Sequence, residues 1–189
     1  MAVETAYRCL GILDVAGGTL LVYGAGTMIG FAAVQMALLR GARVIAAAGD
    51  TFAGQLRAVG AEVTPYGDGM VERVRALASG APASGAPDLI FDAGPISDVL
   101  PDLVRIAGGD AHRVVTVSNH GPAADALGVR HSFAGALGYS VLGEFARLAA
   151  EGRFTVPVAR TFPLEQWREA LEVSLSGRAR GELVLLPGA

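Results

Sequence analysis

The sequence contains no lysine, and all 15 of its basic residues are arginines. A phosphate-binding P-loop needs a lysine after its glycines, so this chain carries no such loop. Schiff-base chemistry needs a lysine amine and is excluded within the chain, as is a tyrosine–lysine catalytic pair.

Cysteine and net charge are also scarce. Cys9 is the single cysteine, so no internal disulfide forms, which is typical of a protein of the reducing cytoplasm. The formal net charge is −3, and no basic face is apparent. The sequence therefore predicts no nucleic-acid partner.

Residues 15–39 carry no charge and form a run long enough to span a membrane. Glycines interrupt this run, and a buried strand, a turn and a helix explain it better. Residues 1–4 lack the basic segment of a signal peptide. We therefore expect a soluble, cytoplasmic protein that has no membrane partner.

Hydrophobic residues make up 52% of the 189 residues, which provides an ample core for one domain. Apolar runs alternate with helical patterns along the chain. The predicted strands are 19–23, 43–47, 61–64, 88–92, 113–117, 155–162 and 182–186. The predicted helices are 4–15, 29–40, 51–59, 71–79, 97–106, 143–151 and 164–176. Residues 80–87 predict a loop, and residues 122–138 show no clear pattern.

The strands are continuous apolar runs, which indicates that both faces of the sheet are buried. The predicted fold class is therefore α/β: a Rossmann-type, doubly wound, mainly parallel sheet with helices on both faces. Right-handed crossovers predict the strand order 3-2-1-4-5, with one or two later strands. We expect residues 1–189 to form a single dinucleotide-binding domain.

A glycine motif joins the first predicted strand to the following helix. Gly24 permits a tight turn, Gly26 lets the backbone approach a pyrophosphate, and Gly30 lets the helix pack closely on the strand. The free N–H groups at the start of the helix then face the anion. The spacing is one residue longer than usual, and a glycine-rich turn without a ligand is the alternative. The candidate binding segment comprises Gly24, Ala25, Gly26, Thr27, Met28, Ile29 and Gly30.

Asp50 lies 20 residues after Gly30, where an acid that binds a ribose is expected. It falls slightly beyond the strand end, so a solvated cap of the next helix is an equal alternative. Ala48 and Gly49 are small and leave room for a 2′-phosphate.

The three histidines, His112, His120 and His131, are not accompanied by a cysteine pair and predict no metal site. His120 follows Ser118 and Asn119 after the fifth strand, where doubly wound sheets bind ligands. These three residues either line a nicotinamide site or form an ordinary polar loop. No residue stands out as catalytic.

Arg178 and Arg180 form a small basic patch near the end of the chain. A solvated loop is the simplest interpretation of this patch. A contact with a cofactor phosphate is the more specific alternative.

Several segments together resemble the zinc-independent medium-chain dehydrogenases/reductases, in their quinone-oxidoreductase-like branch. They are residues 4–8, 22–37, 56–63, 91–94, 113–117, 151–163 and 177–185. The resemblance implies a C-terminal Rossmann domain that binds NADPH, and reduction of quinones, enones or enoyl-type substrates. It also implies an N-terminal GroES-like domain, for which this sequence has no room.

Some positions of this chain match the cofactor-binding residues of the family, and others differ from them. Ala93 falls in a matching segment, and Tyr66 matches a tyrosine that lies beside the adenosine phosphate. Thr27 and Met28 replace family glycines. Phe52 and Glu182 stand where relatives often have a lysine, so two cationic contacts are missing.

NADP(H) is the expected cofactor, with NAD(H) second, because the strand-end positions before Asp50 are neutral. The expected partners are a small-molecule substrate and a second copy of the chain. The uncharged residues 131–143 are the candidate dimer region. An S-adenosylmethionine-dependent methyltransferase and a noncatalytic nucleotide-binding module remain as alternatives, and an antiparallel strand ending the sheet would favour the methyltransferase.

Overall fold

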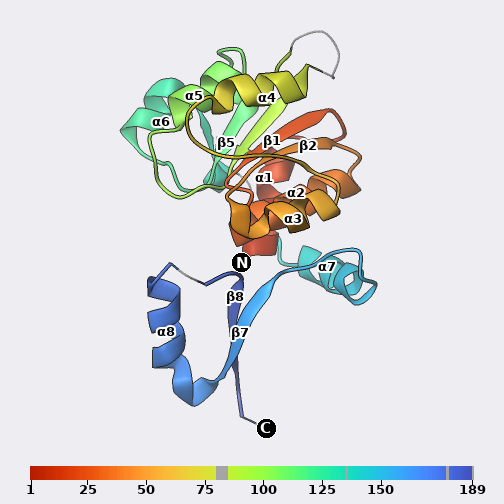
Figure 1. The fold of residues 1–189 in the computed structure, drawn as a ribbon, viewed down its shortest axis with the longest axis vertical. Helices are drawn as coiled ribbons and strands as arrows, with labels where there is room; N and C mark the ends of the chain where they lie inside the picture. The colour runs from red at the N-terminus through yellow and green to blue at the C-terminus, as the bar shows by residue number, and fades with distance from the viewer. Residues whose placement is uncertain (80–84, 135, 178, 189) are drawn as a thin grey trace.

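The computed structural model describes residues 1–79, 85–134, 136–177 and 179–188, and most of the loop predicted for residues 80–87 lies outside them. The described part contains a sheet of six parallel strands in the order β3-β2-β1-β4-β5-β6 (Figure 1). The strands are β1 (Thr19–Tyr23), β2 (Arg43–Ala47), β3 (Glu62–Thr64), β4 (Leu89–Asp92), β5 (Val114–Thr116) and β6 (Arg130–His131). The predicted fold class and strand order are confirmed.

Helices cover both faces of this sheet (Figure 1). One face packs against α1 (Ala2–Ile12), α2 (Met28–Leu39), α3 (Asp50–Ala58) and α7 (Val141–Ala150). The other packs against α4 (Met70–Ala78), α5 (Leu100–Ile106) and α6 (Pro122–Leu127). Leu20 and Val22 of β1 belong to the first core and Leu21 to the second, because successive strand side chains point to opposite faces. The two cores explain why the strands are apolar throughout.

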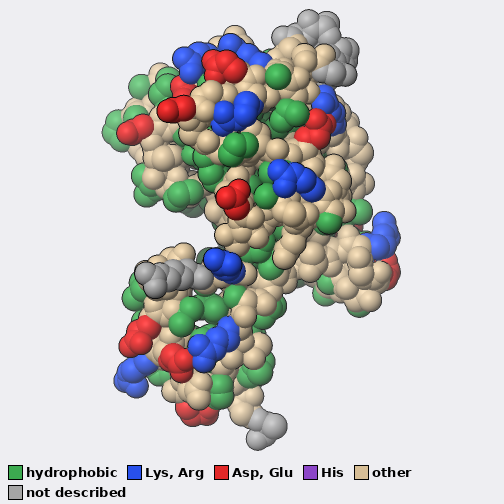
Figure 2. Space-filling model, in the orientation of Figure 1, with side chains coloured by type: hydrophobic (Ala, Val, Ile, Leu, Met, Phe, Trp, Pro, Cys, Tyr) green, Lys and Arg blue, Asp and Glu red, His purple; other side chains and the backbone are tan. Residues whose placement is uncertain are grey.

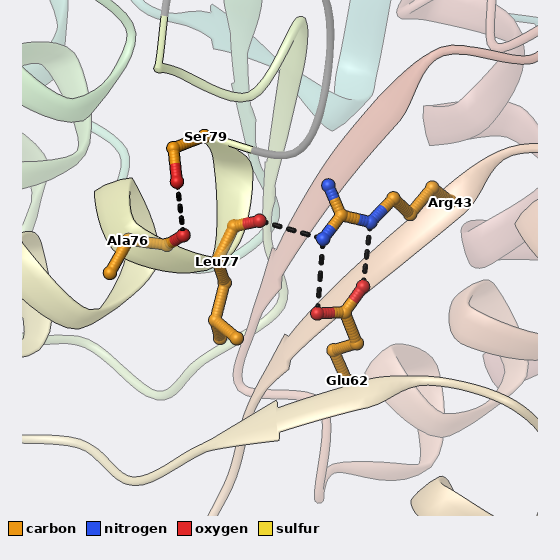
Figure 3. A network of polar contacts seen from close by, with 5 residues as sticks. All are labelled: Arg43, Glu62, Ala76, Leu77 and Ser79. Carbon is orange, nitrogen blue, oxygen red and sulfur yellow. Dashed lines mark hydrogen bonds and ion pairs between the residues drawn. The ribbon is translucent and has the colours of Figure 1, made fainter.

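A polar network at the amino ends of the strands fixes β2, β3 and α4 relative to one another (Figure 3). Arg43 donates from Nε and Nη2 to the two carboxylate oxygens of Glu62, at 2.6 and 3.1 Å. The same Nη2 donates to the carbonyl of Leu77 at 2.7 Å. This bidentate pair lies at the opposite end of the sheet from the glycine motif, so it supports the fold and leaves the carboxyl ends free.

The strands predicted at residues 155–162 and 182–186 form a sheet of their own. β7 (Val158–Pro163) pairs in parallel with β8 (Glu182–Leu186), and α8 (Trp167–Leu175) connects them. We call residues 158–186 the C-terminal unit; Figure 1 shows it apart from the six-stranded sheet. In the described part of the chain, no helix is both long and apolar enough to cross a membrane.

Candidate functional site

The candidate site lies at the carboxyl ends of the central strands. From β1 the chain proceeds outward to β2 and β3, and then crosses to β4 on the other side of β1. The loops after β1 and β4 therefore diverge and leave a crevice at this switch point. The glycine motif follows β1 at this position.

Two glycines of the motif are required by close backbone contacts. Gly24 has φ +77°, and a Cβ there would collide with the backbone of Ala93 and Gly94 after β4. A Cβ on Gly30 would collide with the backbone of Gly24 and Ala25, so α2 packs directly against the turn. Both positions therefore exclude a side chain for steric reasons.

Gly26 differs because a Cβ there would meet only the Phe52 ring, at 3.8 Å. The fold itself therefore tolerates a small side chain at Gly26. The missing side chain leaves open space beside the loop, which is the space that a ligand backbone contact requires.

Thr27 caps α2 and ties it to β4. Its hydroxyl accepts a hydrogen bond from the N–H of Gly30 at 3.0 Å and donates to the carbonyl of Ala93 at 3.0 Å. The threonine that departs from the family's glycine therefore has a structural role at the start of the helix.

Three backbone donors of the loop remain open. The N–H groups of Gly26, Met28 and Ile29 have no hydrogen-bond partner within the described parts of the chain. They precede or begin α2, whose dipole places partial positive charge at this end. Such a cluster of free donors at the start of a helix can bind an anion.

Asp92, at the end of β4, is a buried carboxylate that organises the loops on the far side of the crevice. Its Oδ2 accepts from the hydroxyl of Thr116 at 2.8 Å and from the amide of Asn119 at 2.7 Å, and its Oδ1 accepts from the N–H of Gly94 at 3.0 Å. Burial raises the pKa of Asp92, while these three hydrogen bonds act in the opposite direction. The network holds Gly94 directly against Gly24.

Two tyrosines lie on the other side of the crevice: Tyr23 is the last residue of β1, and Tyr66 follows β3. Tyr23 and Tyr66 meet edge to face, with their ring centroids 5.1 Å apart. Burial, aided by Tyr23 and Asp92, raises the pKa of Tyr66 to about 12. The Tyr66 hydroxyl therefore stays protonated at neutral pH and can donate to a phosphate.

The residues after β2 differ in their exposure to solvent. Ala48 is buried, while Asp50 is exposed in the first turn of α3. Gly49 is the N-cap of this helix, and Asp50 makes no hydrogen bond or ion pair with the described residues. The solvated cap that was the alternative for Asp50 is therefore not formed, because Gly49 takes the N-cap position.

A cavity of about 640 Å3 opens over the glycine loop. Gly26, Gly49, Thr51, Phe52 and Tyr66 line it from the sheet domain, and Gly177, Ala179 and Arg180 line it from the C-terminal unit. Figure 2 shows the molecular surface hollowed between these two parts. Residues predicted from the glycine motif, the β2 end and the β3 end therefore share one space.

The residues predicted after β5 lie around a different cavity. Ser118, Asn119 and His120 line a pocket of about 290 Å3 together with residues of α5 and α6. The His120 ring lies 5.1 Å from Phe133 and 6.0 Å from His131, measured between centroids. The structure thus does not bring His120 into the same cavity as Gly26.

The sequence analysis did not find the Asp92 network, whereas Arg180 was named there with a contact to a cofactor phosphate as the more specific alternative. The signal for the network was an acid at the end of β4 opposite a threonine at the end of β5. Within the described residues, no three His, Cys, Asp or Glu side chains are grouped to hold a metal ion.

The doubly wound sheet, the open donors at its switch point and the cavity above them define a Rossmann-type nucleotide-binding domain. The chain belongs to the zinc-binding dehydrogenase family, whose model matches residues 3–185. The resemblance to medium-chain dehydrogenases/reductases is thereby confirmed. Because β6 is also parallel, the methyltransferase alternative is not favoured.

Solved structures support the same assignment. A crystal structure of an NAD-dependent alcohol dehydrogenase superposes with a TM-score of 0.78 at 25% identity, over 99% of this chain and 57% of that one. The quinone oxidoreductase from Coxiella burnetii shares the fold, with a TM-score of 0.73, 21% identity and coverage of 97% and 57%. An alcohol dehydrogenase superfamily protein from Novosphingobium aromaticivorans also shares the fold. Its TM-score is 0.72 at 23% identity, over 98% of this chain and 62% of that one.

The chain thus spans little more than half the length of these proteins. A search of curated proteins finds no match.

Proposed function

We propose that this chain is the NADP(H)-binding part of an oxidoreductase that transfers hydride to a quinone, enone or enoyl-type substrate. The observation that carries the proposal is the group of open N–H donors at Gly26, Met28 and Ile29, beside a cavity that Gly26 leaves unobstructed. The bound dinucleotide would supply the hydride. The protein would hold the pyrophosphate on the loop and orient the adenosine between the ends of β2 and β3.

The preference for NADP(H) over NAD(H) depends on the end of β2. An acid there would bind the ribose hydroxyls and repel a 2′-phosphate. Ala47 and Ala48 occupy this strand end and are neutral, and Asp50 is not among the residues that line the cavity. Tyr66 lines the cavity and offers a hydroxyl donor.

The test is calorimetric titration of the chain with NADPH and NADH, alongside a Gly26→Val variant. We expect NADPH to bind more tightly than NADH, because the strand end is neutral. The valine side chain would fill the space beside the loop, so the variant should bind neither cofactor. Its melting temperature should stay close to that of the wild type, because the nearest contact of the new Cβ is ordinary.

Two results would contradict the proposal. Tighter binding of NADH would overturn the cofactor preference, and a folded wild-type chain that binds neither dinucleotide would overturn the nucleotide site itself. We expect slow or no turnover of quinones by this chain, because the resemblance implies that an N-terminal domain forms much of the substrate cleft. The decrease in NADPH absorbance on adding a quinone measures this.

A further inference from the structure

The C-terminal unit contributes a guanidinium group to the cavity above the glycine loop. Arg180 lies just before β8 and lines the same cavity as Gly26, Gly49 and Tyr66, although about 150 positions separate it from Gly26. Of the described residues that line this cavity, Arg180 alone carries a formal charge. It forms no ion pair or hydrogen bond with any described residue.

The backbone beside Arg180 is held in place at the start of β8. Glu182 donates its N–H to the carbonyl of Pro157 at 2.7 Å. Gly181 has φ +141°, and a Cβ there would collide with the backbone of Pro157 and Ala159. The close approach of β8 to the start of β7 therefore fixes where Arg180 enters the cavity.

The residues that share the cavity with Arg180 indicate which phosphate group of the cofactor it would contact. The pyrophosphate already has donors in the glycine loop. The adenosine ribose of a dinucleotide lies at the end of β2, which here is represented by Gly49 and Thr51. Arg180 lines the same cavity as these residues and Tyr66, so a 2′-phosphate on this ribose would lie in the same space as its guanidinium group.

We propose that Arg180 binds the 2′-phosphate of NADP(H) and is the main determinant of preference for NADP(H) over NAD(H). This inference rests on the proposed function. A guanidinium group suits the role because its planar N–H groups make paired hydrogen bonds to phosphate and it remains charged at all physiological pH values. The site thus replaces the cationic contacts that are missing at Phe52 and Glu182.

The experiment compares Arg180→Ala with Arg57→Ala, a matched variant. Arg57 is also an exposed arginine without an ion pair among the described residues, but it lies at the end of α3 and does not line the cavity. Calorimetry with NADP+, NAD+, 2′,5′-ADP and 5′-AMP isolates the 2′-phosphate. We expect Arg180→Ala to weaken NADP+ and 2′,5′-ADP about tenfold or more. NAD+ and 5′-AMP should change less than about twofold, and Arg57→Ala should change none of the four.

Three outcomes overturn the inference. Equal weakening of NADP+ and NAD+ by Arg180→Ala, with an unchanged melting temperature, would place the arginine on the pyrophosphate. Unchanged affinity for all four ligands would remove Arg180 from the site while the proposed function stands. A folded wild-type chain that binds none of the ligands would overturn both. An Arg180→Lys variant with intermediate NADP+ affinity would support the phosphate contact, because lysine keeps the charge and loses the paired hydrogen bonds.

Discussion

At the scale of single residues, Cys9 shows how strongly burial alone changes chemistry. The side chain lies on α1 and is fully buried. Burial raises the pKa of its thiol from 9.0 to about 12; Arg8 acts in the opposite direction, and Glu4 adds slightly to the increase. Because the thiolate is the reactive form, the folded protein keeps this cysteine inert.

We expect the Cys9 thiol to resist a disulfide reagent at about pH 8 and to react only after denaturant is added. The folded state binds the proton more tightly than the unfolded state. The free energy of unfolding should therefore fall as the pH rises from 9.0 towards about 12.

Chemical denaturation at several pH values measures this dependence, with Cys9→Ala as the control. The tyrosines also titrate in this range, so the difference between the two proteins isolates the cysteine. Stoichiometric labelling of the native protein would contradict the prediction.

Which residues could be predicted from the sequence depended on whether their role was local. Gly24, Gly26 and Gly30 were identifiable because a turn and a helix start impose their requirements within a few residues. The role of Asp92 was not, because its partners come from β5 and the loop that follows it, and for Arg180 the sequence left a solvated loop and a phosphate contact as alternatives because the cavity joins distant segments. The cap that was one of two alternatives for Asp50 is not formed, because Gly49 is the N-cap and α3 begins at Asp50 itself.

At the scale of elements, a single glutamine joins α2 to the segment before β7. The buried side chain of Gln35 accepts from the N–H of Thr155 at 2.9 Å and donates to its carbonyl at 2.9 Å. The side chain thereby pairs both backbone groups of Thr155, as a neighbouring strand would. The segment that leads into the C-terminal unit is thus fixed against α2 of the sheet domain.

Replacing Gln35 by leucine should lower the free energy of unfolding by about 1 kcal/mol or more, because both backbone groups of Thr155 would lose a part-buried hydrogen bond. Leucine and glutamine have similar helix propensity, so the helix itself is not weakened. Urea denaturation measures the change. The matched variant Gln55→Leu, at an exposed position of α3, should stay within about 0.5 kcal/mol of the wild type. If both variants changed the free energy of unfolding equally, the hydrogen bonds between Gln35 and Thr155 would contribute nothing to stability.

Most elements were predictable because apolar runs and glycine or proline breaks mark them. The strands β1, β2 and β8 begin and end where the sequence indicated. The segment 122–138 was not interpretable because α6 has six residues and β6 has two, too few to show a period. The pairing of β7 with β8 outside the main sheet leaves no trace in either strand's own pattern.

At the scale of the whole molecule, one edge of the six-stranded sheet is exposed beside apolar side chains. β6 is an edge strand, and the residues after it include Phe133 and Leu137, which are 76% and 64% exposed. Tyr139 and Leu142 are also exposed, whereas Val141 is buried. We propose that residues 131–143 form the contact of a homodimer, because an open edge with apolar side chains beside it favours pairing.

Light scattering should give a dimer mass at micromolar protein concentration, and Phe133→Asp should shift the molecule towards the monomer, because a charge would be buried at the contact. Phe133 is exposed in the single chain, so the variant should keep its melting temperature when measured as a monomer. A monomer mass for the wild type over a wide concentration range would contradict the proposal.

The separation of the C-terminal unit from the main sheet also has a thermodynamic consequence. The unit rests on two strands, and most side chains of β7 are exposed, so it should open locally at a lower free energy than the six-stranded sheet. Each opening event would carry Arg180 away and remove one wall of the cavity. Ligand affinity and the local order of β8 are therefore linked. A dinucleotide that binds only while the C-terminal unit is closed must slow amide hydrogen exchange in β8, by the same factor by which it shifts the equilibrium towards the closed unit.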